Sequence, residues 1–182
     1  MPPTPPPSSS PIPVANLAPN TTTVPNLENY LGQTVDTFCG KYGTVGDSFN
    51  HCAHFVCHVL SLKIPGAALC SNVGGTKYSY EDRSKGFCIR VNQVFNNCNN
   101  RAYWDDKNLP SGTCLIIATI PANIETTSPL SIGQMSHKHI GFYTGGQVYH
   151  YSNTRDKVIK QAVSEFKNHY GGKTVLLRCD LP

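Results

Sequence analysis

Residues 50–60 read NHCAHFVCHVL, and the apolar residues among them recur with the spacing of an α-helix. On an ideal helix at about 100° per residue, Cys52 falls in the middle of an apolar arc. That arc consists of Phe55, Val56, Val59, Leu60 and Leu62. The sequence therefore predicts a helix from Cys52 to about Leu62 with a cysteine on its buried face. The N-cap is predicted to be Asp47, Ser48 or Asn50.

A cysteine at the start of a helix is suited to nucleophilic chemistry. The helix dipole and the free N–H groups stabilise the thiolate, so they predict a lowered pKa for Cys52. Two other roles are open. The thiol can be an inert core group, or the other face of the helix can bind a metal through His51, His54 and His58 together with Cys57. No CxxC or similar ligand pair follows downstream, so we predict neither a metal nor another cofactor.

A hairpin supplies candidates for the base that a thiol nucleophile requires. Residues 139–144 and 147–151 are strand-like runs on either side of Gly145-Gly146, and pairing across this turn brings His150 near His139. A catalytic thiol needs a base, and the base needs a third polar group that orients it. We therefore predict Cys52 as nucleophile, His139 as base and His150 as the orienting residue. Taken singly, each histidine also fits a structural role.

The remaining segments predict an α+β domain over residues 26–182. Helices are expected at residues 26–38, 89–97 and 164–170, the last capped by Ser164. Strands are expected at residues 114–120, 157–161 and 174–178 in addition to the hairpin. Residues 1–25 hold nine of the fourteen prolines and no charged residue, which predicts an extended or disordered arm.

Composition limits the classes of partner. The formal net charge is +4 with no cluster of Lys and Arg, which argues against nucleic acid. No apolar run approaches the ~20 residues of a membrane span, and the first residues lack the basic and apolar regions of a signal peptide. Eight cysteines favour an oxidising compartment. Cys70 with Cys88 or Cys98 are candidate bridges, although sequence does not determine connectivity.

Two motifs together resemble a known family. Cys52-Ala-His-Phe-Val, followed by His139-Ile-Gly-Phe-Tyr-x-Gly-Gly-x-Val-Tyr-His150, is similar to the NlpC-type cell-wall peptidases and the CHAP amidases over about residues 40–152. The resemblance implies a papain-like fold in which the nucleophile helix packs on an antiparallel sheet. It also implies Cys52 as nucleophile, His139 as base, His150 as third residue and Tyr42 as an aid to oxyanion stabilisation.

The chain departs from this family around the nucleophile. Where the family has Asp-Cys-Ser-Gly, this chain has His-Cys-Ala-His at residues 51–54, which is closer to the Asn-Cys-Glu-His-Phe-Val of the lecithin-retinol-acyltransferase-like enzymes. In those enzymes the histidine precedes the cysteine, whereas here Cys52 precedes His139 as in the peptidases. Residues 62–110 have no counterpart in the family.

The resemblance implies a monomeric cysteine amidase or endopeptidase that cleaves peptidoglycan stem peptides. The Pro-rich arm and the missing signal peptide suggest an antibacterial effector that is exported by a secretion-system partner, acts in the periplasm or cell wall of a target bacterium, and is neutralised by an immunity protein. Other acyl-transfer enzymes stay open, namely a lipid acyltransferase, a thioesterase or a protein-modifying toxin. A non-catalytic wall-binding module is the remaining alternative.

Overall fold

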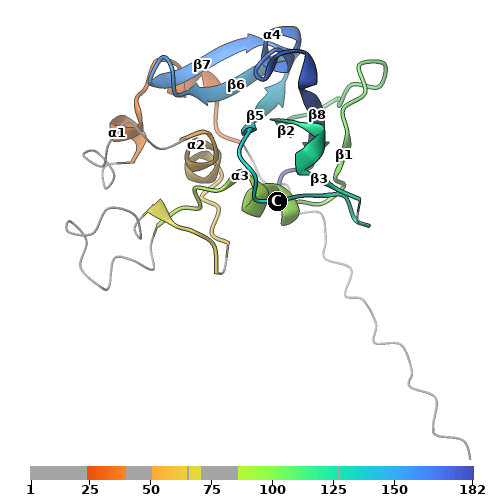
Figure 1. The fold of residues 1–182 in the computed structure, drawn as a ribbon. Helices are drawn as coiled ribbons and strands as arrows, with labels where there is room; N and C mark the ends of the chain where they lie inside the picture. The colour runs from red at the N-terminus through yellow and green to blue at the C-terminus, as the bar shows by residue number, and fades with distance from the viewer. Residues whose placement is uncertain (1–23, 40–50, 65, 71–85, 127) are drawn as a thin grey trace, which may run out of the picture.

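The computed structural model describes residues 24–39, 51–64, 66–70, 86–126 and 128–182, and it shows an antiparallel sheet with helices on both faces (Figure 1). The six strands lie in the order β1-β8-β2-β5-β6-β7. Their bounds are β1 Ala102–Tyr103, β2 Cys114–Thr119, β5 Lys138–Thr144, β6 Gln147–Ser152, β7 Lys157–Ala162 and β8 Val175–Cys179. A second small sheet pairs β3 (Ile124–Glu125) with β4 (Ser131–Ile132). The predicted α+β class is confirmed.

Four short α-helices accompany the sheet in the described part of the chain. They are α1 Val35–Phe38, α2 Cys52–Val59, α3 Val91–Asn96 and α4 Val163–Lys167. The same part of the chain also holds three 3₁₀ turns, at Leu27–Tyr30, Pro121–Asn123 and Gly171–Lys173. None of these helices is long and apolar enough to cross a membrane.

The two faces of the sheet carry separate cores. Every residue of β2 is buried, which is why its sequence is a continuous apolar run rather than an alternating one. The larger core lies between the sheet and α2, where the Phe55 ring meets the Phe142 ring edge-on at 5.8 Å. The smaller core lies on the opposite face under α4 and centres on Phe166. Figure 1 shows α2 and α4 on opposite sides of β5 and β6.

The single helix predicted over residues 26–38 is wrong, because the segment breaks at Gly32. This glycine has φ +78°, in the left-handed region that glycine tolerates. The turn lets the chain pair with the edge of the sheet: Gly32 N–H donates to Val158 O, and Val158 N–H donates to Gln33 O, each at 2.9 Å. Two edge hydrogen bonds to β7 replace the helical bonds that the segment gives up.

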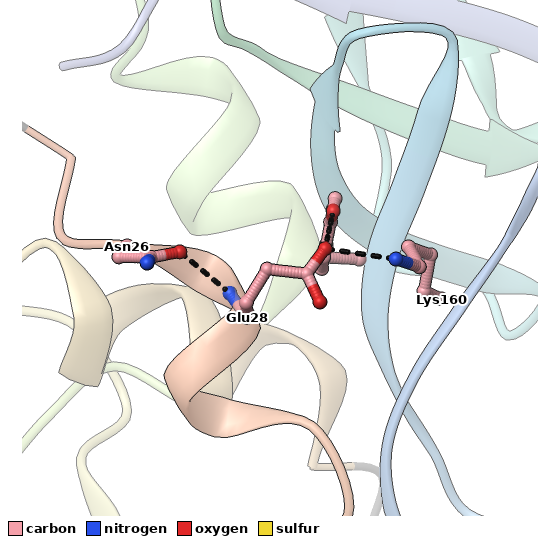
Figure 2. Close-up of polar contacts among 4 residues, drawn as sticks. Asn26, Glu28 and Lys160 are labelled. Atoms are coloured by element: carbon pink, nitrogen blue, oxygen red, sulfur yellow. Dashed lines mark hydrogen bonds and ion pairs between the residues drawn. The ribbon is translucent and has the colours of Figure 1, made fainter.

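The 3₁₀ turn Leu27–Tyr30 is bound to the same edge of the sheet through the carboxylate of Glu28. The Glu28 carboxylate accepts a hydrogen bond from the Lys160 ammonium at 2.8 Å and another from the Tyr149 hydroxyl, while the Glu28 N–H donates to the Asn26 side chain at 3.1 Å. Figure 2 shows Glu28 between Asn26 and Lys160. Val24 also packs partly buried against the larger core. Of the predicted arm, residues 1–23 lie outside the described residues.

The other predicted elements are confirmed with shifted ends. Helix α2 stops at Val59, three residues before the predicted end, because Ser61 takes φ +49° and the Leu62 N–H returns to Cys57 O. The predicted N-cap residues Asp47, Ser48 and Asn50 lie outside the described residues. Helix α4 begins at Val163 rather than after Ser164, since the Glu165 carboxylate accepts the Ala162 N–H at 2.8 Å.

Candidate functional site

Cys52 is the first residue of α2 and is fully buried. The helix start is held by the turn that follows β6, because the His51 N–H donates to the Asn153 side-chain oxygen at 3.1 Å. The His51 ring also meets the Tyr151 ring edge-on at 5.5 Å. These contacts fix the beginning of α2 against the central strands, so the thiol is held at a defined place on the sheet.

Burial decides the protonation of this thiol. It raises the pKa of Cys52 to about 12, although hydrogen bonds from the backbone of Ile140, Ala53 and Cys52 itself act in the opposite direction. The lowered pKa predicted from the helix start is therefore wrong for the free protein. The desolvation of a fully buried thiolate outweighs the stabilisation that the N–H groups supply. Cys52 is a neutral thiol at neutral pH.

His139, the predicted base, and His150, the predicted orienting residue, contact each other. His139 Nε2 and His150 Nδ1 lie 2.7 Å apart, and the two side chains are 1% and 2% exposed. The rings meet edge-on at 4.7 Å and 84°. Gly141 makes this approach possible, since a Cβ at that position would lie 2.9 Å from the Cβ of His150 and 2.7 Å from the backbone oxygen of Tyr149.

Cys52, the predicted nucleophile, and His139, the predicted base, pack in different cores. Cys52 belongs to the core on the α2 face, together with Ile140. The His139 ring packs on the α4 face, 5.5 Å from the Phe166 ring. This separation follows from the alternation of side chains along β5. The structure therefore joins His139 to His150, and it joins Cys52 to the backbone of Ile140, the residue that follows His139.

Sequence reasoning missed two members of this site. The His169 ring stacks on the His139 ring at 4.1 Å and 17°. Tyr170 follows it, and burial raises the pKa of its hydroxyl, with the negative charge of a Cys52 thiolate adding to the effect. Both residues follow α4, thirty and thirty-one positions from His139 along the chain. The only signal in the sequence is the polar and aromatic run Asn168-His169-Tyr170 itself. No local spacing relates these residues to the hairpin, so their position beside His139 was not predictable.

A pocket of about 280 Å³ opens beside the start of β5. Its lining consists of residues 89–92 and 134–138. The wall at 134–138 is held by the buried Asn123, whose side-chain amide donates to Met135 O at 3.2 Å and to Ser136 O at 3.0 Å. Two cations, Arg90 and Lys138, belong to the lining. The pocket therefore offers an anionic group a place beside Lys138, the residue that precedes His139 in β5.

The buried histidines predict that the folded protein loses stability as the pH falls. Burial, followed by the charges of His150 and His169, holds the pKa of His139 well below 6.5; burial lowers that of His150 to about 4 and also lowers that of His169. Below about pH 6.5 the unfolded chain binds protons that the folded chain does not, so the free energy of unfolding should fall by about 1.4 kcal/mol per pH unit for each of the two buried histidines, His139 and His150. The loss from His150 is complete near pH 4.

Urea unfolding at about pH 7 and about pH 5 measures this dependence. His150→Gln removes one of the titrating groups, so its stability should vary less steeply with pH than that of the wild type. Equal pH dependence in the two proteins would show that His150 does not titrate with folding.

The histidine-rich face of α2 carries a second cluster, which overlaps in part with the metal-binding alternative that was left open from the sequence. The metal-binding alternative combined His51, His54 and His58 with Cys57. The structure instead gathers Cys39, His54, His58 and Cys70, whose ligand atoms all lie within 4.8 Å of one another. A hydrogen bond with Cys39, and weaker ones with His54 and His58, lower the pKa of the Cys70 thiol to about 2.

The candidate disulfides of the sequence are not formed. Cys70, Cys88 and Cys98 are free thiols. Cys57 forms a hydrogen bond with Cys88, and Cys98 forms one with Cys179. Bridges from Cys70 to Cys88 or Cys98 were therefore the wrong pairs, because Cys70 has Cys39 as its partner thiol. These pairs join segments that are distant in sequence, which spacing alone does not reveal.

Tyr42, the proposed aid to oxyanion stabilisation, lies outside the described residues.

Comparisons of the chain with protein-family models, with characterised proteins and with solved structures found no match.

Proposed function

We propose that this protein is a papain-like cysteine amidase that cleaves amide bonds in peptidoglycan stem peptides. The observation that carries the proposal is the buried hydrogen bond between His139 and His150, next to the residue whose backbone contacts the Cys52 thiol. Thiol acyl transfer requires a nucleophile, a base and a group that orients the base, and we assign these roles to Cys52 at the start of α2, His139 on β5 and His150 on β6.

The protonation of these groups favours general-base activation over a preformed ion pair. Cys52 is a neutral thiol and His139 a neutral imidazole, because burial disfavours the charged form of each. A base must lie within hydrogen-bond reach of the nucleophile, so this mechanism requires His139 to approach the Cys52 sulfur, which in the structure contacts the backbone of Ile140. As the sulfur attacks the carbonyl carbon, His139 would then take the thiol proton and later give it to the leaving amine. Water then hydrolyses the thioester, again with His139 as base.

His150 orients the base in this scheme. Its Nδ1 engages His139 Nε2, so Nδ1 is the His139 nitrogen that remains for proton transfer. The oxyanion of the tetrahedral intermediate would be stabilised by the backbone N–H of Cys52 at the start of α2. The partial positive charge at the start of α2 would also stabilise the negative charge of this oxyanion.

The pocket beside β5 supports an acidic peptide as substrate. Stem peptides of peptidoglycan carry free carboxylates, and Arg90 and Lys138 in the lining provide the complementary charge. We also propose that the substrate lies in the wall of a competing bacterium and that the Pro-rich arm serves export. This part of the proposal is based on the composition of residues 1–25.

The test is to incubate the full chain with purified peptidoglycan and to identify the released fragments by mass spectrometry. We expect soluble fragments with a new free amine and a new carboxylate at one position of the stem peptide, and no release by Cys52→Ala. If the folded wild type releases nothing, or if Cys52→Ala releases the same fragments, the proposal is wrong.

A further inference from the structure

Four buried or half-buried side chains converge on one point beside α2, away from the histidine pair of β5 and β6. His54 and His58 are one helical turn apart on α2, with ring centroids 4.8 Å apart. Cys39 caps the end of α1, and Cys70 follows the residue that pairs with Cys88 in an isolated β-bridge. The four ligand atoms lie within 4.8 Å of one another.

This spacing suits one tetrahedral metal ion. With Zn–S bonds of about 2.3 Å and Zn–N bonds of about 2.0–2.1 Å, the edges of the ligand tetrahedron measure about 3.3–3.8 Å. A cluster within 4.8 Å therefore closes around an ion with shifts of an ångström or less at each side chain. Two thiolates and two imidazoles form the ligand set that selects zinc in structural sites.

The surroundings also fit a structural metal centre. Cys39 and Cys70 are 3% exposed and His54 is fully buried, so water has little access to the cluster. The His58 ring packs at 3.9 Å on that of Phe87, and the Phe38 ring lies 5.5 Å from it, which encloses the site in aromatic side chains. Four protein ligands would fill a tetrahedral coordination shell, which is typical of a structural rather than a catalytic zinc site.

We propose that Cys39, His54, His58 and Cys70 bind one Zn²⁺ in a closed structural site. Binding displaces the protons of the two thiols, and the two imidazoles coordinate in their neutral form. The ion would link the end of α1, the middle of α2 and the segment at Cys70. Since α2 begins with Cys52, the ion would position the nucleophile helix without taking part in chemistry. This proposal stands independently of the proposed enzymatic function.

Metal analysis of the full-length chain, purified after expression with added zinc, tests the site directly. We expect about one Zn²⁺ per chain, with a Kd of about 1 nM or lower. Removing the metal with a strong chelator should lower Tm by about 10 °C or more, and Zn²⁺ should restore it. Co²⁺ added to the metal-free, reduced chain should give thiolate-to-cobalt charge-transfer bands and the intense visible bands of tetrahedral coordination.

Variants distinguish this site from adventitious binding. Cys70→Ser and His58→Ser should lose the metal, whereas His58→Cys replaces one zinc ligand by another and should keep it. Cys57→Ser is the matched control, because Cys57 is an equally buried thiol on the same helix that contacts Cys88 instead.

Three results would overturn the proposal. The first is a reduced wild-type chain that binds neither Zn²⁺ nor Co²⁺. The second is a metal content that survives both Cys70→Ser and His58→Ser. The third is a Cys39–Cys70 disulfide, detected by mass spectrometry of the chain as purified, that leaves no thiolates for a metal.

Discussion

Cys52→Ala and His139→Ala should each lower the rate of peptidoglycan cleavage by at least about 10⁴-fold, and the double variant should be no slower than either single variant. The effects do not add because the two groups act in the same step: without the base the thiol keeps its proton, and without the thiol the base has no proton to accept. The measurement is the initial rate of fragment release by each variant.

The stability of the variants separates a catalytic loss from unfolding. Replacing one buried thiol by a hydrogen atom leaves a small cavity, so Cys52→Ala should cost about 1 kcal/mol and shift Tm by only a few degrees. Cys57→Ser on the same helix should keep its activity, because the Cys57 thiol contacts Cys88 rather than the strand that carries His139. An equal loss in Cys57→Ser would mean that the wrong thiol has been assigned.

His150 provides a graded test of the same site. His150→Gln keeps a hydrogen-bonding group beside His139 and should retain measurable activity, whereas His150→Ala should lose more. Full activity in His150→Ala would show that His150 does not orient the base. The 2.7 Å contact between His139 and His150 would then be purely structural.

Gly141→Ala should strongly destabilise the sheet. The new Cβ would lie 2.7 Å from the Tyr149 backbone oxygen and 2.9 Å from the Cβ of His150, so β6 must move away from β5. Overpacking against backbone of this kind costs about 3 kcal/mol, or a fall in Tm of about 6–12 °C. The shift also separates His150 from His139, so the activity of the remaining folded protein should fall as well.

Gly112→Ala is the matched control for this experiment. A Cβ at Gly112 meets no atom within 4 Å, so its free energy of unfolding should change by no more than about 0.5 kcal/mol. Urea unfolding and fragment release are measured for both variants. A Gly141→Ala protein with the stability and activity of Gly112→Ala would contradict the close approach of β5 and β6.

The elements of the fold were predictable where neighbouring residues decide them. The hairpin of β5 and β6 follows from Gly145 and Gly146, which have φ +57° and +82°, between runs of strand-forming residues. The apolar run of β2 and the helical spacing after Cys52 are equally local. The pairing of His139 with His150 was predictable for the same reason, since a tight turn determines which residues of a hairpin come together.

Other features depend on contacts between segments that are distant in the chain. The pKa of Cys52 follows from burial between α2 and the sheet, which reverses the effect expected from the helix start alone. The face occupied by His139, and the stacking of His169 on it, depend on where α4 packs. The sequence by itself determined the helix, the hairpin and the histidine pair. Tertiary packing decided the burial of the thiol and the meeting of Cys39 and Cys70 with the histidines of α2, because desolvation and long-range proximity are not encoded in local spacing.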